Sequence, residues 1–156
     1  FQNRIFLNEL QEVKWNIVEQ QRFVDTGKKY FEDGRLKFYY SIDECIKESN
    51  PNVLLLSSVL QYLEDPYRFL ETLENYYFNY ILIDRTAFIN DPQDRLTVQK
   101  VPPEIYKASY PAWFFNEQKF LGYFLNNYTL INSFSSLDKY NVEGAYSKGF
   151  ILKRKK

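Results

Sequence analysis

The order of apolar and polar residues along the chain alternates short apolar runs with segments of helical spacing. The apolar runs predict strands at Trp15 to Val18, Leu36 to Tyr40, Val53 to Leu56 and Tyr80 to Ile83. The third of these is apolar at every position, which is typical of a strand that is buried on both faces. Strands that alternate with helices favour a parallel sheet built from crossover units.

Helices are expected between these strands. Arg22 to Phe31 and Ile42 to Glu48 have helical character, and Asp65-Pro66 begins a third helix with Asp as N-cap and Pro at the first helical position. Asn116 caps a fourth helix. The apolar faces predicted for the third and fourth helices are Phe69, Leu70, Leu73 and Tyr77, and Phe120, Leu121, Phe124, Leu125 and Tyr128. Phe1 to Leu10 also has nearly helical spacing.

From Ala87 onward the chain departs from this alternation. Ala87 to Phe115 lacks periodicity and contains prolines at positions 92, 102, 103 and 111, so we expect a long loop, of the kind that often forms a lid or a binding site. Thr129 to Phe134 and Gly149 to Leu152 read as two strands joined by a polar loop. The predicted fold class is α/β: one Rossmann-like domain over residues 1–156, with a mainly parallel sheet flanked by helices and an antiparallel C-terminal strand pair.

The composition removes several classes of function. Lys+Arg and Asp+Glu both total 20, and this balance argues against a nucleic-acid partner. No apolar run approaches the roughly 18 residues that a membrane span needs, and no signal peptide is visible. With no His and a single Cys45, a zinc site is not expected, Ser-His-Asp and Cys-His nucleophiles are excluded, and no internal disulfide can form. These features predict a cytoplasmic protein that needs no metal.

Polar side chains follow three of the predicted strands. Glu19 ends the first, Ser57 and Ser58 end the third, and Asp84 and Arg85 end the fourth. Ligands bind outside the carboxyl ends of the strands in an open parallel sheet. An acidic residue at the position of Glu19 commonly accepts hydrogen bonds from ribose hydroxyls, although a solvated loop carboxylate is the alternative.

The segment from Val53 to Pro66, VLLLSSVLQYLEDP, resembles the fourth-strand motif of class I S-adenosylmethionine-dependent methyltransferases, which reads much like VLxHLxDPxxxL. Gln61 stands where many members have His, so a histidine base cannot be carried over. Together with Trp15 to Glu19, Ile83 to Thr86 and Val101 to Tyr106, the segment also resembles a group of bacterial methyltransferases that is often found among surface-polysaccharide genes.

The resemblance implies S-adenosylmethionine as the cofactor. It places Glu19 at the ribose, Tyr40 and Ser41 along the adenine, and Ser57, Ser58 and Gln61 under the reacting methyl group. The family pattern opens with a strand and a glycine-rich turn that would precede Phe1, so we expect the first strand to be missing from the chain and the cofactor to need that segment. With 14 Tyr and 14 Phe in the chain, core packing is the alternative role for any one tyrosine.

The proline-rich stretch Val101 to Phe115 is the candidate substrate loop. Tyr106, Tyr110 and Trp113 supply aromatic faces, and Glu104, together with Asp84, is a candidate catalytic base. A rigid surface loop that packs against the sheet is the alternative. The predicted function is methyl transfer to a small molecule or glycan precursor; a non-catalytic module that binds a ligand or partner remains open, and a nicotinamide-dependent dehydrogenase is disfavoured by the motif from Ser57 to Pro66. The oligomeric state is not predicted.

Overall fold

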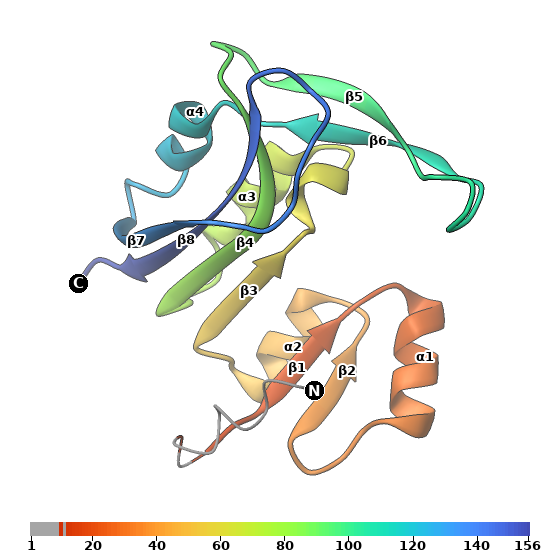
Figure 1. Cartoon of the computed structure of the whole chain (residues 1–156). Helices are drawn as coiled ribbons and strands as arrows, with labels where there is room; N and C mark the ends of the chain where they lie inside the picture. Colours follow the sequence, from red (N-terminus) through yellow and green to blue (C-terminus); the bar gives the residue numbers. More distant parts are fainter. Residues whose placement is uncertain (1–9, 11) are drawn as a thin grey trace. The chain divides into compact units, whose positions relative to one another are not determined.

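The computed structural model describes residue 10 and residues 12–156 (Figure 1). The helix expected over Phe1 to Leu10 therefore lies outside the described residues, apart from Leu10 itself. The described part of the chain forms two compact units, which meet in sequence between Pro51 and Asn52. Each unit is described by itself below, and the single domain expected over residues 1–156 stays a prediction.

The first unit is a strand–helix–strand crossover followed by a second helix. It contains β1 (Trp15–Val18), α1 (Gln21–Tyr30), β2 (Leu36–Tyr39) and α2 (Ile42–Ser49). The two strands are parallel, and Trp15 lies opposite Leu36 at the start of the pair. All four elements were predicted from the sequence to within one residue at each end, and the parallel pairing confirms the crossover.

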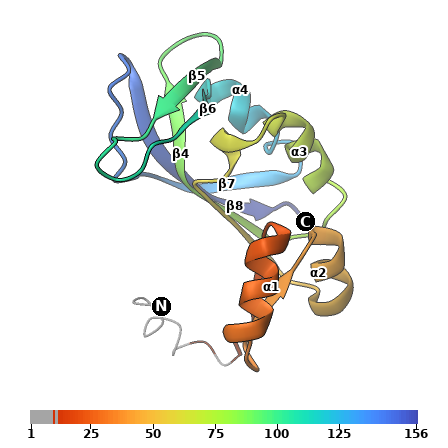
Figure 2. The same ribbon diagram turned by 90° about the vertical axis from the view of Figure 1, so that its right-hand side faces the viewer.

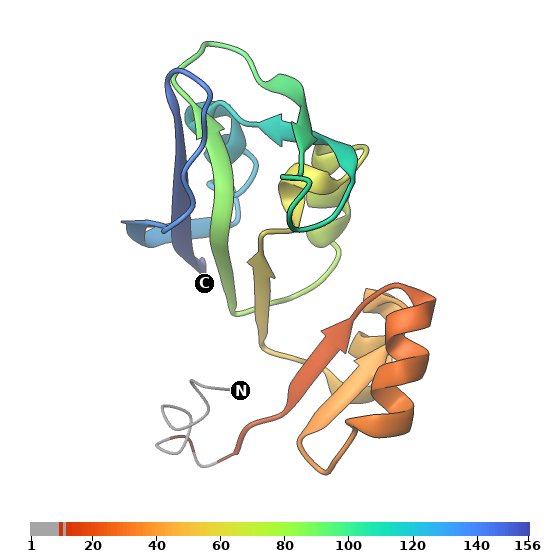
Figure 3. The ribbon, with the colours of Figure 1, turned by 45° about the vertical axis from the view of Figure 1, so that its right-hand side comes forward.

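The two helices of the first unit cover opposite faces of this strand pair. The Phe38 ring in β2 lies against Gly27 in α1. The next residue, Tyr39, turns the other way, and its hydroxyl lies 2.5 Å from Ser49 Oγ at the end of α2. Successive side chains of a strand point to opposite faces, so α1 and α2 lie on either side of the pair, as can be followed in Figure 3.

The second unit is built on a four-stranded sheet in the order β3-β4-β8-β7. Its elements are β3 (Val53–Ser57), the short 3₁₀ helix η2 (Leu60–Tyr62), α3 (Pro66–Leu73), β4 (Tyr80–Ile89), β5 (Arg95–Lys100), β6 (Ser109–Phe114), α4 (Glu117–Gly122), β7 (Tyr128–Ser135) and β8 (Ala145–Arg154). β3 and β4 are parallel, and β8 is antiparallel to both of its neighbours. β3, β4 and β7 therefore share one direction. The predicted antiparallel pair of C-terminal strands is found, but only the β3–β4 pairing of this sheet is parallel.

Aromatic packing joins the helices of the second unit to its sheet. Phe88 in β4 packs edge-on against Phe120 in α4 and against Phe150 in β8, with ring centroids 5.2 Å and 5.6 Å apart. Phe115, which is fully buried, lies between Phe120 and Tyr67 of α3. Figure 2 shows α3 and α4 on the same face of the sheet. The predicted N-caps are confirmed, since Asp65 accepts from the Arg68 amide and Asn116 from the Lys119 amide.

Two expectations for the second unit are wrong. The strand expected to end at Ile83 continues to Ile89, because one extra residue is absorbed as a β-bulge between Ile83 and Thr86. The segment from Ala87 to Phe115, expected to be a loop, contains the end of β4 and the antiparallel hairpin β5–β6. Pro111 is accommodated because a two-stranded ribbon leaves one side of β6 without a ladder to complete.

The helices α3 and α4 are also shorter than their apolar spacing predicts. α3 ends at Leu73, and Tyr77 beyond it is 77% exposed instead of packed on the helix face. α4 ends at Gly122; the chain then continues in tight turns, such as Phe124 N to Leu121 O at 2.9 Å. Tyr128 is buried, but as the first residue of β7. Apolar spacing alone thus did not locate the helix ends.

Candidate functional site

A cluster of polar residues in the second unit lies where β3 ends beside the bulge of β4. Ser57, the last residue of β3, is aligned with Asp84, and the amide of Ser58 donates to the Asp84 carbonyl oxygen at 3.0 Å. Ser58 and Arg85 have φ angles of 55° and 50°. This left-handed conformation costs about 1 kcal/mol or more for a residue other than glycine. The backbone strain is therefore concentrated at these two adjoining positions.

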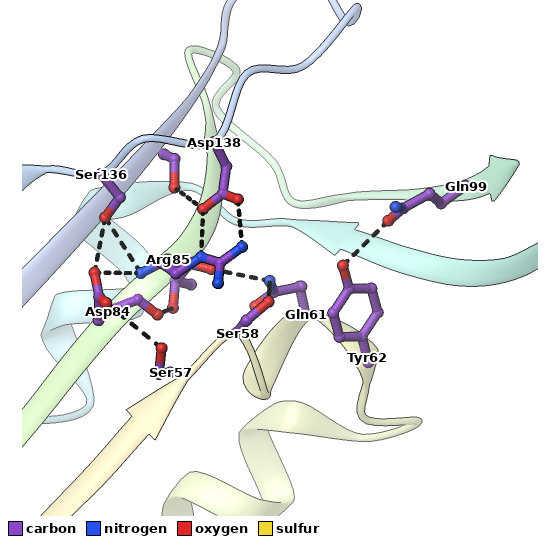
Figure 4. A network of polar contacts seen from close by, with 11 residues as sticks. Ser57, Ser58, Gln61, Tyr62, Asp84, Arg85, Gln99, Ser136 and Asp138 are labelled. Carbon is purple, nitrogen blue, oxygen red and sulfur yellow. Dashed lines mark hydrogen bonds and ion pairs between the residues drawn. The ribbon is translucent and has the colours of Figure 1, made fainter. Parts of the chain in front are cut away.

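Asp84 is the centre of this site (Figure 4). Its Oδ1 atom accepts from the Arg85 amide at 2.8 Å and from the Ser136 hydroxyl at 3.0 Å. Among the described residues, its Oδ2 atom accepts only from the Ser57 hydroxyl, at 3.5 Å. Hydrogen bonds of this type are normally 2.5–3.0 Å long, so Oδ2 is the carboxylate oxygen with capacity for another donor.

A second carboxylate, Asp138, holds the Arg85 side chain. Arg85 Nε and Nη2 donate to the two oxygens of Asp138 at 3.0 Å and 2.8 Å, which is the bidentate geometry that suits a guanidinium. The hydrogen bond from Arg85 is the main cause that lowers the pKa of the Asp138 carboxyl, and the same bond raises the pKa of Arg85. Asp138 thus holds the guanidinium of Arg85, while Asp84 bonds to the backbone amide of the same residue.

Gln61 joins the 3₁₀ helix η2 to the bulge. Its side chain is almost fully buried, and Nε2 donates to Ser58 Oγ at 3.2 Å and to the Arg85 carbonyl oxygen at 3.0 Å. Its Oε1 is buried without a hydrogen-bond partner among the described residues. The structure thus brings together Ser57, Ser58, Gln61 and Asp84, all of which were predicted to be site residues.

The hairpin β5–β6 brings aromatic side chains to the same region. The rings of Tyr110 and Tyr62 meet edge to face at 5.4 Å, and the Tyr62 hydroxyl donates to Gln99 Oε1 at 3.2 Å. Burial is the first cause that raises the pKa of Tyr110, followed by the neighbouring hydroxyls of Tyr62 and Tyr106. Trp113 donates its indole N–H to the Leu63 carbonyl oxygen at 3.2 Å. These contacts attach the hairpin to η2.

The remaining two candidates lie in the turn between β5 and β6. Glu104 is exposed, and Tyr106 is 55% exposed. Among the contacts of the described residues, none joins Glu104 to Asp84. The assignment of Glu104 as a base therefore stays a prediction, while Asp84 has the polar surroundings that such a role requires.

In the first unit, Glu19 directly follows β1. Its Oε2 atom accepts from the Gln20 amide at 2.8 Å, and its side chain is exposed. Tyr40 donates its hydroxyl to Asp25 at 2.7 Å, and Ser41 caps α2 by accepting from the Glu44 amide at 3.1 Å. Glu19 and Ser41 belong to one unit and Ser57 to the other, so their convergence along one edge stays a prediction.

Sequence reasoning missed Ser136 and Asp138, which lie in the polar loop between β7 and β8. A signal was present, because β7 runs in the same direction as β3 and β4. Its carboxyl end must therefore lie at the same edge of the sheet, where ligands bind in such folds. Reading the loop as a third strand end would have added both residues to the candidate site.

Two kinds of feature are absent from the described residues. No group of three or more His, Cys, Asp or Glu side chains in that part of the chain is arranged to bind a metal ion. In the same residues, no helix has the length and apolar character required to cross a membrane.

Comparison with known proteins gives a fold. No known family and no curated protein sequence matches the chain. Among solved structures, an S-adenosylmethionine-dependent methyltransferase from Methanosarcina mazei matches with a TM-score of 0.56 and 10% identity over 89% of this chain and 80% of that one. The glycopeptide N-methyltransferase MtfA, solved with S-adenosylmethionine, matches with a TM-score of 0.52 and 7% identity over 99% and 93% of the two chains.

A third match is the 1,6-didemethyltoxoflavin-N1-methyltransferase of Burkholderia thailandensis, solved with its substrate and S-adenosylhomocysteine. Its TM-score is 0.52, with 14% identity over 99% of this chain and 66% of that one. The fold of the chain is therefore the α/β fold of S-adenosylmethionine-dependent methyltransferases.

Proposed function

We propose that this protein is a cytoplasmic S-adenosylmethionine-dependent methyltransferase that acts on a small molecule or a glycan precursor. The observation that carries the proposal is the cluster of Ser57, Gln61 and Asp84, which lies where β3 ends beside the bulge of β4 in a methyltransferase fold. The sequence motif from Val53 to Pro66 supports it independently, because it covers the same strand and loop. The surface-polysaccharide context suggested by the sequence belongs to the same proposal.

The residues present fit the cofactor at the position that the structure lets us examine. Glu19 follows a parallel strand, and its Oε2 accepts only from the amide of the next residue. Its exposed carboxylate has the capacity to accept from the two vicinal hydroxyls of a ribose. Tyr40 and Ser41 have their polar atoms occupied within the first unit, so they would contribute mainly ring surface and backbone. When bound, the cofactor supplies an electrophilic methyl group on a sulfonium.

The chain's own residues then have to orient the acceptor and remove its proton. Methyl transfer depends chiefly on alignment of donor and acceptor. The Asp84 Oδ2 atom, with its single long contact, can accept a proton or a hydrogen bond from an O–H or N–H acceptor. Tyr62 and Tyr110 offer aromatic faces that hold a planar or cyclic acceptor beside it.

Two of the similar structures support the substrate range. One is a glycopeptide N-methyltransferase and the other methylates 1,6-didemethyltoxoflavin, a small molecule, according to their names. The chain has equal numbers of acidic and basic residues, so it offers no excess of positive charge for a nucleic-acid partner. A compact polar or glycosidic acceptor therefore fits the proposal better than a polymer of phosphates.

A second candidate is a non-catalytic module that binds a ligand or partner on the same fold. The observation in its favour is that the site's ionised groups already have partners: Asp84 Oδ1 has two donors, and Asp138 is occupied by Arg85. Such a network can serve to hold the loops in place. The two candidates differ in whether a methyl group is transferred.

Isothermal titration with S-adenosylhomocysteine tests the cofactor part of the proposal. In a protein that carries the expected first strand and glycine-rich turn before Phe1, we expect binding that weakens about tenfold or more in Glu19→Gln, since a hydrogen bond to a charged group contributes roughly 1.5–3 kcal/mol and about 1.4 kcal/mol is a factor of ten. Glu12→Gln, an exposed carboxylate paired with Lys14 at 3.1 Å, is the matched control. Equal affinities for the protein and Glu19→Gln would contradict the assignment.

Transfer is tested with radiolabelled S-adenosylmethionine and a small-molecule extract of cells. If the protein is a methyltransferase, we expect label in an acid-stable product. Asp84→Asn should remove that label while leaving cofactor affinity within about twofold. Binding without any labelled product would favour the non-catalytic module instead.

A further inference from the structure

β7 is an exposed edge of the four-stranded sheet. Within the described residues it pairs only with β8 and ends the strand order β3-β4-β8-β7, as can be seen in Figure 1. After the buried Tyr128, every residue of the strand is exposed. An edge strand presents a row of unpaired N–H and C=O groups that can pair with another chain.

This edge lacks the charge that normally discourages such pairing. Proteins protect exposed edges with charged side chains, above all Lys, and with Pro. From Tyr128 to Leu137 the sequence YTLINSFSSL contains neither a charged residue nor Pro, whereas 26% of the whole chain is charged. Ile131, Phe134 and Leu137 are 55%, 38% and 95% exposed along it. The register shift beside Ile131 leaves Asn132 to Ser135 in regular pairing with β8.

The order of residues along this edge is symmetric in polarity. Two polar residues lie on each side of Phe134. An apolar residue lies beyond each of these polar pairs, Ile131 on one side and Leu137 on the other. We propose that β7 pairs with β7 of a second copy of the chain in antiparallel orientation, with Phe134 opposite Phe134 and Ile131 opposite Leu137.

The backbone is in the right phase for this register. Ser136 donates its amide to Ser147 in β8 at 3.1 Å, so its polar backbone groups point into the sheet. Successive residues of an antiparallel strand alternate between the two neighbouring strands. Ser133 and Ser135 therefore point their N–H and C=O groups outward, and the symmetric register places Ser133 opposite Ser135 of the second copy as a hydrogen-bonded pair.

A second copy fits this edge better than an unrelated strand. A two-fold interface is self-complementary by construction, and here the same rotation matches apolar with apolar and polar with polar residues at all seven positions from Ile131 to Leu137. No like charges meet across it. The dimer joins two sheets into one continuous sheet and does not depend on the proposed methyl transfer.

Sedimentation velocity over a concentration series tests the interface. We expect the full chain to dimerise, and Ile131→Glu or Leu137→Lys alone to weaken dimerisation by about tenfold or more, because each places a charge against an apolar side chain. The double variant Ile131→Glu/Leu137→Lys brings the two charges opposite each other at both ends of the proposed register, so it should recover much of the loss. Val53→Glu, at a 42% exposed position on the opposite edge strand β3, is the control.

Circular dichroism of each variant establishes that it folds. A wild-type chain that stays monomeric at about 100 μM would overturn the proposal. A dissociation constant above that concentration corresponds to a binding free energy of less than about 5.5 kcal/mol. A dimer that is lost in Val53→Glu but retained in Ile131→Glu would place the interface on β3. A double variant that is no better than the worse single variant would contradict the register.

Discussion

Gly149 lies directly opposite Phe134 in the β7–β8 pair, and the Phe134 ring covers its α-carbon. A Cβ atom at position 149 would overlap this ring and would come within 2.7 Å of the Ile83 carbonyl oxygen at the bulge of β4. The ring could move, but the carbonyl belongs to the backbone of the central strand. We therefore expect Gly149→Ala to destabilise the protein by about 1–3 kcal/mol, the usual range for overpacking, measured by denaturant unfolding.

Gly122→Ala is the control for that experiment. No atom lies within 4 Å of the Cβ that it would add at the end of α4. A change from glycine to alanine at a compatible position usually stabilises a protein by about 0.4–1 kcal/mol, because it lowers the conformational entropy of the unfolded chain. If both variants had the same stability as the wild type, the close approach at Gly149 would have no energetic consequence.

Gly27 has the corresponding role in the first unit. It lies in α1 directly beneath the Phe38 ring of β2, so that an added methyl group would overlap the ring. Although alanine is the better helix former by roughly 1 kcal/mol, we expect the overlap to exceed this gain and Gly27→Ala to lower the unfolding midpoint. Gly34→Ala, where the added Cβ meets nothing within 4 Å, should not lower it. A raised unfolding midpoint for Gly27→Ala would show that α1 and β2 move apart freely to make room for the methyl group.

The phenol of Tyr67 predicts a loss of stability at alkaline pH. Burial, followed by the 2.8 Å hydrogen bond to Asp94, raises the pKa of Tyr67 well above its ordinary value of 10.0. The folded protein therefore favours the neutral phenol: this contribution is complete below about pH 10 and is lost as the pH rises beyond that value. We expect Tyr67→Phe to flatten the dependence of the unfolding free energy on pH above 10, whereas Tyr77→Phe, at a 77% exposed ring, leaves it unchanged.

The pair of Asp138 and Arg85 predicts the opposite behaviour in acid. Because the pKa of Asp138 is lowered in the folded protein, its contribution is present above the ordinary value of 3.8 and is lost as the pH falls below it. Both side chains are partly exposed, so the pair should contribute less than about 1 kcal/mol. Asp138→Asn should reduce the acid dependence of the melting temperature between about pH 4 and 2. Glu143→Gln is the control, and an equal effect from both would contradict the pairing.

The elements that the sequence located best are those with local signals. β1, α1, β2 and α2 follow from apolar runs and turn residues within a few positions of each other. The caps Asp65 and Asn116 were predictable because a short polar side chain before a helix accepts from the third amide beyond it.

The hairpin β5–β6 and the bulge at Asp84-Arg85 were not predictable by the same means. Arg95 to Lys100 does alternate in polarity, but Pro102, Pro103 and Pro111 near it read as signs of a loop. The extra residue in β4 is recognised only from its pairing with β8, which begins about 60 residues later in the chain. Local spacing carries no information about that partner.

The candidate site likewise contains residues that the sequence predicted and residues that only the structure revealed. Ser57, Ser58 and Asp84 were predicted because they follow apolar strands, and Gln61 because of the methyltransferase resemblance; the structure joins all four by hydrogen bonds. Ser136 and Asp138 reach Asp84 and Arg85 across more than 50 positions of sequence. That contact depends on the order β4-β8-β7, which is a property of the whole sheet.

The division into two units gives the protein a pair of built-in optical reporters. It has two tryptophans: Trp15 in β1 of the first unit, 44% exposed, and Trp113 in β6 of the second, half-buried with its indole N–H bonded to the Leu63 carbonyl oxygen. Their fluorescence should therefore differ in emission maximum, with the more solvated Trp15 emitting further to the red. Each single-tryptophan variant, Trp15→Phe or Trp113→Phe, then follows the unfolding of one unit without an added dye.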